Sequence, residues 1–343
     1  MFQTYINHFL QGFANPFTIW FMKAVSTMGT LPFYLLMVFI VTFGWDFKKG
    51  FFLTHVMIWV NVTNNFLKEY LALPRPVDID GTLSVFGTDY NHIDLDTVNH
   101  SADGFFKGLS PDIIAQCRNA GLPSPGFPSG HTAGAAGVWP VLAWLIRNKW
   151  MWIISVLFII MIMLSRMFLG AHFPADVTGG LVNGLVIAAA GIWLASRVPA
   201  ILQSIPENRL SLGFYILKYT YLLLAPLVLC FIPHIGVTFA APLFGINLII
   251  LITPVRRIRQ NTGLLKRALR VLIAIILFIG TTVLMTILPI SGGEVMQFIS
   301  ITLQYVLVFQ LTIGLSRMTG LYERIIEDRR VCDTSTNALP GRP

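Results

Sequence analysis

The sequence predicts an all-α protein, a polytopic bundle of transmembrane helices. Composition is the first observation: 55% of the 343 residues are hydrophobic and 12% are charged, whereas soluble domains average about 25% charged residues. The second is that the apolar residues form runs long enough, or nearly so, to span a bilayer as helices. The third is that basic clusters follow every second run, which is typical of topology signals. The net charge of +8 is therefore attributed to orientation, and nucleic acid is not an expected partner.

Nine apolar runs are expected to form the spans. They cover residues 31–46, 50–71, 129–146, 150–165, 174–196, 213–232, 238–253, 271–288 and 296–316. Residues 1–30 are expected to form an interfacial segment, because Asn15, Pro16 and Lys23 interrupt their apolar stretch; a tenth, weak span is the alternative. Residues 317–343 follow the last run and are expected to form a cytoplasmic tail.

The basic clusters predict the orientation of the bundle. They follow the first, third, fifth, seventh and ninth runs, and Lys and Arg accumulate on the cytoplasmic side of membranes. The other connections, at residues 72–128, 166–173, 233–237 and 289–295, are therefore expected to face outward. Only the first is long, so residues 77–127 are an outward insertion. It either caps a site or is a disordered decoration.

Three polar stretches lie at the outward ends of the runs. Lys68 to Pro76 closes the second run, Pro128 to His131 opens the third, and Ser165 to Asp176 joins the fourth to the fifth. Because the orientation was assigned without these residues, their occurrence on one side of the membrane is independent support for a shared site.

The basic side chains and one helix start predict an anion site. Lys68, Arg75 and Arg166 are cations at membrane-edge depth. Single cations there extend to the headgroups, but three that converge require an anion, and the arginine fork suits phosphate oxygens. Ser129 and Gly130 begin a helix whose free N–H groups favour an anion. A simple serine cap is the alternative for Ser129.

Two histidines and a carboxylate predict nucleophilic chemistry. His172 and Asp176 are four residues apart, and Pro174 between them is expected to start a helix. Asp176 can accept from one ring nitrogen of His172, which leaves the other nitrogen free to attack phosphorus. His131 can protonate the departing oxygen as general acid and then activate water. A histidine that only caps a helix would not need a carboxylate inside an apolar span.

These stretches, K-x6-R-P, P-S-G-H and S-R-x5-H-x3-D, resemble the three signature motifs of the type 2 phosphatidic acid phosphatase (PAP2) superfamily, in the family's order. The resemblance covers roughly residues 20–197. It implies a catalytic membrane core at residues 31–197, to which residues 213–316 add about four further transmembrane helices without a motif. It also implies that His172 is the nucleophile, His131 the general acid and Asp176 the orienting group. Phosphate binding falls to the remaining motif residues, Lys68, Arg75, Ser129, Gly130 and Arg166.

The resemblance further implies metal-independent hydrolysis of a lipid phosphate monoester or diphosphate through a phosphohistidine, without a cofactor. Substrates of the phosphatidic acid, phosphatidylglycerol phosphate or undecaprenyl diphosphate type are expected, at the periplasmic face of a bacterial inner membrane. The alternatives are a lipid phosphotransferase with the same intermediate, and a transporter or scramblase-like role for the last helices. Three scattered cysteines, Cys117, Cys230 and Cys332, predict neither a disulfide framework nor a zinc site. The headgroup and the oligomeric state stay open.

Overall fold

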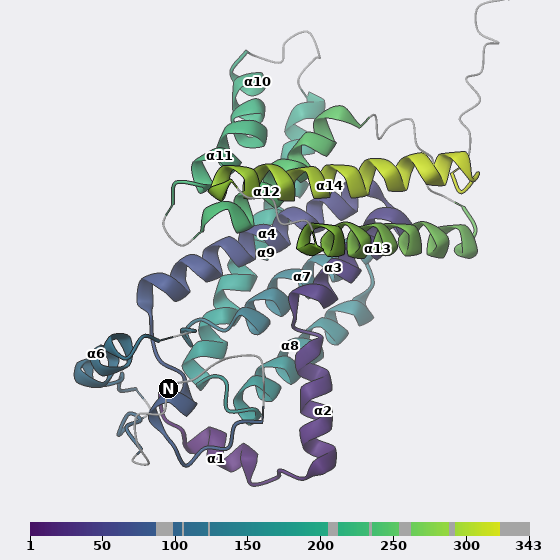
Figure 1. Cartoon of the computed structure of the whole chain (residues 1–343). Coiled ribbons are helices and arrows are strands. Elements are labelled where there is room, and N and C mark those ends of the chain that lie inside the picture. The colour runs from purple at the N-terminus through teal and green to yellow at the C-terminus, as the bar shows by residue number, and fades with distance from the viewer. Residues whose placement is uncertain are drawn as a thin grey trace, which may run out of the picture.

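The chain is built from helices, as the sequence predicts (Figure 1). A computed structural model describes residues 1–86, 99–104, 106–122, 124–204, 212–232, 235–253, 262–287 and 292–322. In these ranges no β-strand forms, and one isolated β-bridge joins Asp80 to Asn99. The predicted cytoplasmic tail, residues 317–343, lies mostly outside the described part.

The helices follow the apolar runs closely. In chain order they are α1 (Tyr5–Gln11), α2 (Pro16–Thr27), α3 (Leu31–Phe39) with the π-helix η1 (Ile40–Trp45), α4 (Phe47–Leu71), α5 (Pro76–Ile79), α6 (Pro111–Asn119), α7 (Gly130–Ile146), α8 (Lys149–Phe168), α9 (Pro174–Ser204), α10 (Leu212–Tyr219) with the π-helix η3 (Thr220–Leu224), α11 (Ala225–Leu229), α12 (Gly236–Ile252), α13 (Leu264–Ile287) and α14 (Gly293–Met318). Each of the nine predicted runs therefore contains helix.

Fewer helices meet a strict length and hydropathy criterion for crossing a membrane. Among the described residues, α8, α13, α14 and the Pro174–Arg197 part of α9 meet it. A fifth path joins α2 to α3 and η1 across a bend of 52°, so part of the segment expected at the interface continues the first apolar run. Two stretches predicted as spans, Ile216–Leu229 and Gly236–Ile252, are shorter apolar helices. The chain is a multi-pass membrane protein. The boundary at residue 30, between the expected interfacial segment and the membrane core, stays a prediction.

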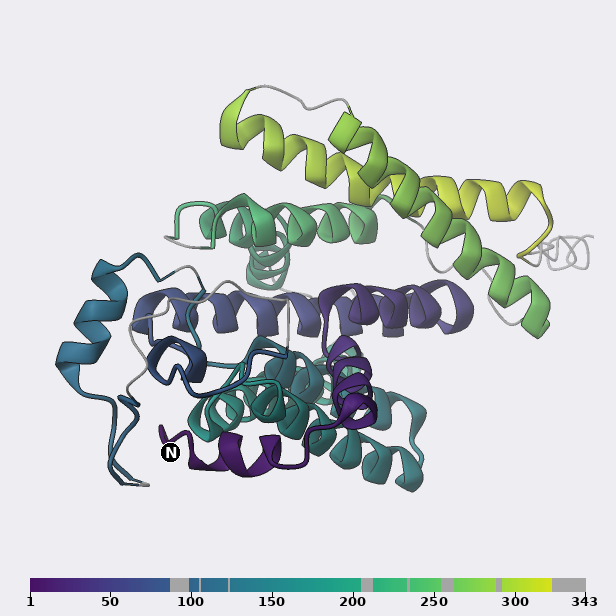
Figure 2. The same cartoon turned by 60° about the horizontal axis from the view of Figure 1, so that its bottom comes forward.

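Helix α4 separates the molecule into two halves. Figure 2 shows α7, α8 and α9 on one side of α4 and α12, α13 and α14 on the other. The half that contains α7, α8 and α9 buries a core around Leu53, Val60 and Val141. The second core joins Phe43 and Phe47 to side chains of α12–α14 such as Phe309. Because α4 contributes to both cores, it fixes one half to the other.

Glycines allow α7 and α9 to pack with their backbones in close contact. A Cβ atom on Gly180 would lie 2.4 Å from the Ser129 carbonyl oxygen, and one on Gly184 would lie 2.3 Å from the Ala133 carbonyl oxygen. Small residues commonly allow such close approach between membrane helices. As a result, the start of α7, which carries the second motif, is held against the start of α9, which carries the end of the third motif.

The turn between α8 and α9 also depends on a glycine. Gly170 has a φ of +78°, which other residues adopt only with strain. An added Cβ would lie 3.0 Å from the Ser84 carbonyl oxygen. Helix α9 then begins at Pro174, where a missing N–H is tolerated. This short turn holds His172 between the two helices.

Candidate active site

The three sequence motifs meet at one end of the helices. His172 approaches Arg75 of the first motif and Asp176 of the third, and Asp176 bonds to Ser129 of the second. Five of the predicted site residues have exposed fractions of 5% or less: Arg75, Ser129, Arg166, His172 and Asp176. Buried polar groups at a shared location need partners from one another, and the motifs supply them.

Asp176 connects two motifs through three contacts. One carboxylate oxygen, Oδ2, lies 3.3 Å from Nδ1 of His172 and accepts a hydrogen bond from the Phe173 N–H at 2.9 Å. The Asp176 backbone carbonyl accepts from the Ser129 N–H at 2.9 Å. The Asp176 side chain is fully buried. The carboxylate is therefore fixed against the histidine ring, and the backbone of Asp176 is fixed against the start of α7.

The neighbours of His172 define its tautomer. Arg75 Nη1 lies 3.5 Å from Nε2 of His172, and a guanidinium has donors only. Nε2 therefore presents a lone pair to Arg75, and Nδ1 carries the proton that faces Asp176. Burial lowers the pKa of His172 well below its ordinary value, and the charges of Arg75, Arg166 and Lys68 lower it further. A neutral ring with a free Nε2 lone pair is the form that a nucleophile requires.

Two of the predicted phosphate-binding cations contact the same short segment. Arg75 donates from Nε to the Ser124 carbonyl at 2.9 Å and from Nη2 to the Ser124 hydroxyl at 2.9 Å. Lys68 donates from Nζ to the Pro125 carbonyl. A further Arg75 bond, from Nη1, reaches the Ala171 carbonyl at 3.0 Å. The end of the predicted insertion thus supplies acceptors to cations from the first motif.

Arg166 and His131 complete the cluster from α8 and α7. Arg166 donates from Nη1 to the Ser26 hydroxyl of α2 at 2.6 Å. His131 stands in the first turn of α7, where its ring lies about 3.0 Å from the position of a Cβ on Gly29. Its Nε2 is buried without a hydrogen-bond partner among the described residues. Both histidines are close enough to Lys68, Arg75 and Arg166 to be influenced by their charges.

The start of α7, which is predicted to bind phosphate, has no side-chain cap from Ser129 and has space beside Gly130. Ser129 is the N-cap of α7, yet its side chain makes no capping hydrogen bond. Its hydroxyl accepts instead from Thr132 at 3.2 Å. Gly130 follows with no close backbone neighbour, since an added Cβ would meet only the Asn64 amide nitrogen, at 3.4 Å. The α7 N–H groups at this end are thus not capped by Ser129, which argues against the simple serine cap.

Three residues that the motifs did not indicate also hold this end together. Asn7 of α1 is fully buried and donates from Nδ2 to the carbonyls of Met167 and His172, at 2.9 and 3.0 Å. Ser26 and Ser124 accept from the two arginines. The one available signal was the spacing of polar residues in α1: Gln11 lies four positions after Asn7 and donates to the Phe168 carbonyl at 3.1 Å.

No cluster of three or more His, Cys, Asp or Glu side chains that could hold a metal ion occurs in the described part of the chain. His92, a histidine of the insertion, lies outside that part. The site is therefore described by its histidines, one carboxylate and three cations.

The fold and this site define a class: helical membrane proteins in which two histidines and a buried carboxylate lie near three cationic side chains. Residues 49–199 match the family model of the PAP2 superfamily. This segment contains all three motifs, so the resemblance to the PAP2 superfamily that the motifs predict is confirmed for it.

Curated relatives resemble parts of this segment. Phosphatidylglycerophosphatase B of Bacillus subtilis is 31% identical over 114 residues, which cover 31% of this chain and 52% of that protein. Glucose-6-phosphatase 3 of Mus musculus is 42% identical over 107 residues, which cover 27% and 30%. Lipid A 4'-phosphatase of Bacteroides thetaiotaomicron is 28% identical over 207 residues, which cover 57% and 78%. The match spans about half or less of the length of the first two relatives.

Among solved structures, a transmembrane PAP2 type phosphatidylglycerolphosphate phosphatase from Bacillus subtilis is similar with a TM-score of 0.42 and 21% identity. The similarity covers 57% of this chain and 85% of that one.

Proposed function

We propose that this protein is a membrane phosphatase that hydrolyses a lipid phosphate monoester or diphosphate through a phosphohistidine intermediate. The observation that carries the proposal is the setting of His172: a buried ring with Nδ1 facing Asp176 and Nε2 beside Arg75. A histidine with a purely structural role would not need a carboxylate at one ring nitrogen and, at the other, an arginine of the kind that binds phosphate. The residues predicted from the motifs are the residues to which we assign roles.

In the first step, the Nε2 lone pair of His172 attacks phosphorus. A P–N bond forms, the P–O bond to the leaving group breaks, and His131 donates a proton to the departing oxygen. In the second step, water attacks phosphorus and gives its proton to His131, and the P–N bond breaks. Inorganic phosphate leaves, and both histidines return to their starting states. Asp176 offsets the positive charge that develops on His172.

The cations stabilise the transferring phosphoryl group. Lys68, Arg75 and Arg166 supply positive charge, and the Ser129 hydroxyl and the N–H groups from Gly130 onward supply donors at the start of α7. Such donors stabilise the equatorial oxygens of a phosphoryl group. This set supplies the charge that a metal ion provides in other phosphatases, which is why we propose metal-independent hydrolysis.

A lipid substrate is favoured by the membrane setting and by the relatives named for phosphatidylglycerophosphate and lipid A. We favour a bacterial glycerophospholipid or isoprenoid phosphate, such as phosphatidylglycerol phosphate or undecaprenyl diphosphate. The basic connections support a site at the outer face of the inner membrane, toward the periplasm. A sugar phosphate is the second candidate, because the similarity to glucose-6-phosphatase 3 reaches 42% identity.

The test is phosphate release by the full chain in nanodiscs, with EDTA present, from phosphatidic acid, phosphatidylglycerol phosphate, undecaprenyl diphosphate and glucose 6-phosphate. We expect a lipid to be the best substrate and His172→Ala to lower kcat by about 10⁴-fold or more, the scale of removing a nucleophile. His100→Ala, a histidine of the insertion, is the matched control. Rapid quenching with labelled substrate should trap label on His172.

Each result bears on one part of the proposal. Full activity of His172→Ala contradicts the nucleophile, and loss of activity in EDTA contradicts metal independence. Preference for glucose 6-phosphate contradicts the lipid substrate. Transfer of label to an added lipid alcohol in preference to water identifies a phosphotransferase.

A further inference from the structure

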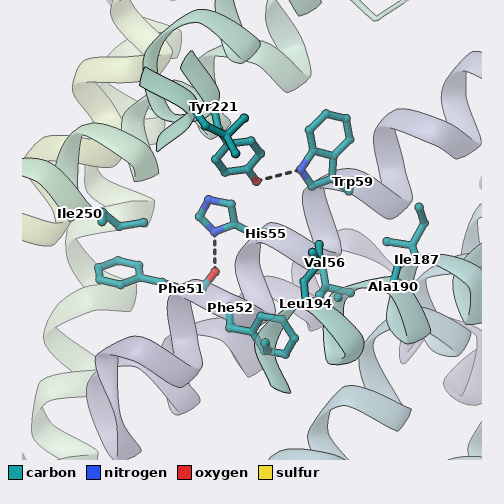
Figure 3. A pocket seen from close by; sticks show the side chains of 13 residues that line it. Phe51, Phe52, His55, Val56, Trp59, Ile187, Ala190, Leu194, Tyr221 and Ile250 are labelled. Atoms are coloured by element: carbon teal, nitrogen blue, oxygen red, sulfur yellow. Dashed lines mark hydrogen bonds between the residues drawn. The ribbon is translucent and has the colours of Figure 1, made fainter. Parts of the chain in front are cut away.

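A cavity of about 810 Å³ lies between the two halves of the molecule (Figure 3). Helix α4 contributes Phe51, Phe52, His55, Val56 and Trp59 to its wall, and α9 contributes residues between 187 and 195. The opposite wall comes from the other half, with Leu217 and Tyr221 from α10 and η3 and Ile250 from α12. This volume is within the range of ligand pockets.

The cavity is remote from the catalytic residues. On α4, His55 precedes Lys68 by 13 positions, and on α9, Ala190 follows Asp176 by 14 positions. At 1.5 Å per residue, each separation is about 20 Å along the helix. The hydrocarbon core of a bilayer is about 30 Å thick. The cavity and the phosphate site therefore lie in opposite leaflets, and one substrate headgroup cannot occupy both.

The wall of the cavity is apolar, and its polar groups are already bonded. His55 Nδ1 lies 2.7 Å from the Phe51 carbonyl oxygen, and Nε2 lies 2.8 Å from the Asn247 amide oxygen. Trp59 donates from Nε1 to the Tyr221 hydroxyl at 3.1 Å, as Figure 3 shows. Trp59 and Tyr221 are thus paired with each other, and the His55 ring lies between two protein oxygens, of which a neutral ring donates to one. Because the polar groups of the wall face protein atoms in this way, the wall selects hydrocarbon and not a polar ligand.

The mouth of the cavity opens sideways to the bilayer. Leu194, Leu217 and Tyr221 have exposed fractions of 51%, 68% and 37%. In a membrane protein such exposed apolar side chains face lipid tails. The occupant can therefore enter from the hydrocarbon region of the leaflet without crossing an aqueous surface.

Several residues of the cavity wall have basic residues close to them in the sequence. Lys48 and Lys49 lie within one turn of Phe52 on α4, Arg197 lies three positions beyond Leu194 on α9, and Lys218 adjoins Leu217. Lys48, Arg197 and Lys218 are exposed. The neighbouring acid, Asp46, accepts from the Lys49 N–H as the cap of α4. An anionic headgroup above the cavity would thus meet positive charge from both halves.

We propose that the cavity binds an acyl chain of an anionic phospholipid from the leaflet opposite the catalytic residues, with its headgroup among Lys48, Arg197 and Lys218. The lipid bridges the two halves beside the His55–Asn247 and Trp59–Tyr221 hydrogen bonds. This site is independent of the proposed reaction, because it requires neither His172 nor a phosphate ester that is cleaved.

The first experiment uses the unmodified full chain in nanodiscs that contain phosphatidylglycerol with a diazirine in its acyl chain. After irradiation, adducts are mapped by peptide mass spectrometry. We expect adducts at His55, Trp59 and Tyr221 severalfold above those at Ile276 and Ile279, exposed residues on α13 (59% and 56%) that report ordinary lipid contact. Equal labelling of the cavity and of α13 would overturn the proposal.

Variants separate the acyl chain from the headgroup. Ala190→Trp fills the cavity and should lower its adducts severalfold, whereas Leu185→Trp, a lipid-exposed control on α9 (41%), should not. Arg197→Gln and Lys218→Gln should each lower the preference for phosphatidylglycerol over phosphatidylcholine by about fivefold, the scale of one basic residue at a membrane surface. Unchanged adducts in Ala190→Trp contradict the cavity as the site. Equal labelling by both lipids in the wild type contradicts an anionic occupant.

Discussion

Both halves of the molecule bury arginines, but the surroundings of those arginines differ. In the half that contains α7–α9 and the proposed active site, called the catalytic half below, Arg75 lies beside the ring of His172. It bonds to Ser124 and Ala171. In the other half, Arg270 of α13 is fully buried and donates to the carbonyls of Phe43 and Leu321, at 2.8 and 3.1 Å. Its guanidinium carbon lies 4.6 Å from the centre of the Tyr322 ring.

The difference shows that burial of a charge does not by itself indicate a reactive site. Arg270 ends on backbone carbonyls from η1 and from the residues after α14, so it fixes chain segments to one another. Arg75 faces Nε2 of His172, a titratable ring whose other nitrogen, Nδ1, faces Asp176. Removing polar groups from the catalytic half should therefore change the rate, and removing them from the other half should change stability.

The largest effect is expected for Asp176→Asn. The neutral amide removes the negative charge that offsets the positive charge developing on His172, and an amide N–H turned toward Nδ1 would favour the tautomer in which Nε2 has no lone pair for the attack. We expect kcat to fall by about 10³–10⁴-fold, as when the orienting carboxylate of a catalytic histidine is replaced. The measurement is kcat on the best lipid substrate, with thermal unfolding to show that the variant folds. A fall of less than tenfold in a folded variant would remove Asp176 from its proposed role.

The next effect concerns the contact between α7 and α9. In Gly184→Ala the new methyl group meets the Ala133 carbonyl at 2.3 Å and the Gly137 nitrogen at 2.8 Å, so the helices must separate. We expect the free energy of unfolding to fall by about 3 kcal/mol. The matched control is Gly280→Ala on α13, where nothing lies within 4 Å; it should be neutral or stabilising by up to about 1 kcal/mol. Equal unfolding transitions in mild detergent for the two variants would argue against the close packing of α7 and α9.

The smallest effect is expected for Arg270→Met. The change leaves the buried carbonyls of Phe43 and Leu321 without this donor, at a cost of about 2 kcal/mol in unfolding free energy. Because Arg270 does not contact the site, kcat/KM should stay within about twofold of wild type. Lys266→Met is the control, since the exposed Lys266 bond to Gly320 should be worth less than about 0.5 kcal/mol. Loss of activity without loss of stability would contradict the division of roles between the halves.

The sequence predicted the positions of the helices well, and it made the three polar motifs conspicuous, for a physical reason. A membrane helix must form its backbone hydrogen bonds internally and present apolar side chains to the lipid. A continuous run of apolar residues therefore indicates where the helix lies. The three motifs concentrate charged and polar residues at run ends, where their cost in lipid requires an explanation. The runs 129–146 and 174–196 accordingly correspond to α7 and α9.

What the sequence did not reveal depends on contacts between distant segments. Asn7 lies 165 positions from His172, whose carbonyl it contacts, and Ser26 lies 140 positions from Arg166. Each is a single polar residue with no local pattern to mark its partner. The bend between α2 and α3 was also not predicted, because Asn15 and Pro16, which interrupt the apolar stretch, mark the start of α2 and not the break at residues 28–30.

The bonds from Lys68 and Arg75 to residues 124 and 125 have a thermodynamic consequence. An arriving phosphate meets cations whose hydrogens already point at protein oxygens. Binding is therefore an exchange of acceptors, and only the surplus of the new bonds over the old ones appears as affinity. Inorganic phosphate faces the same exchange in reverse on its way out, so the protein itself competes with its product for the cations.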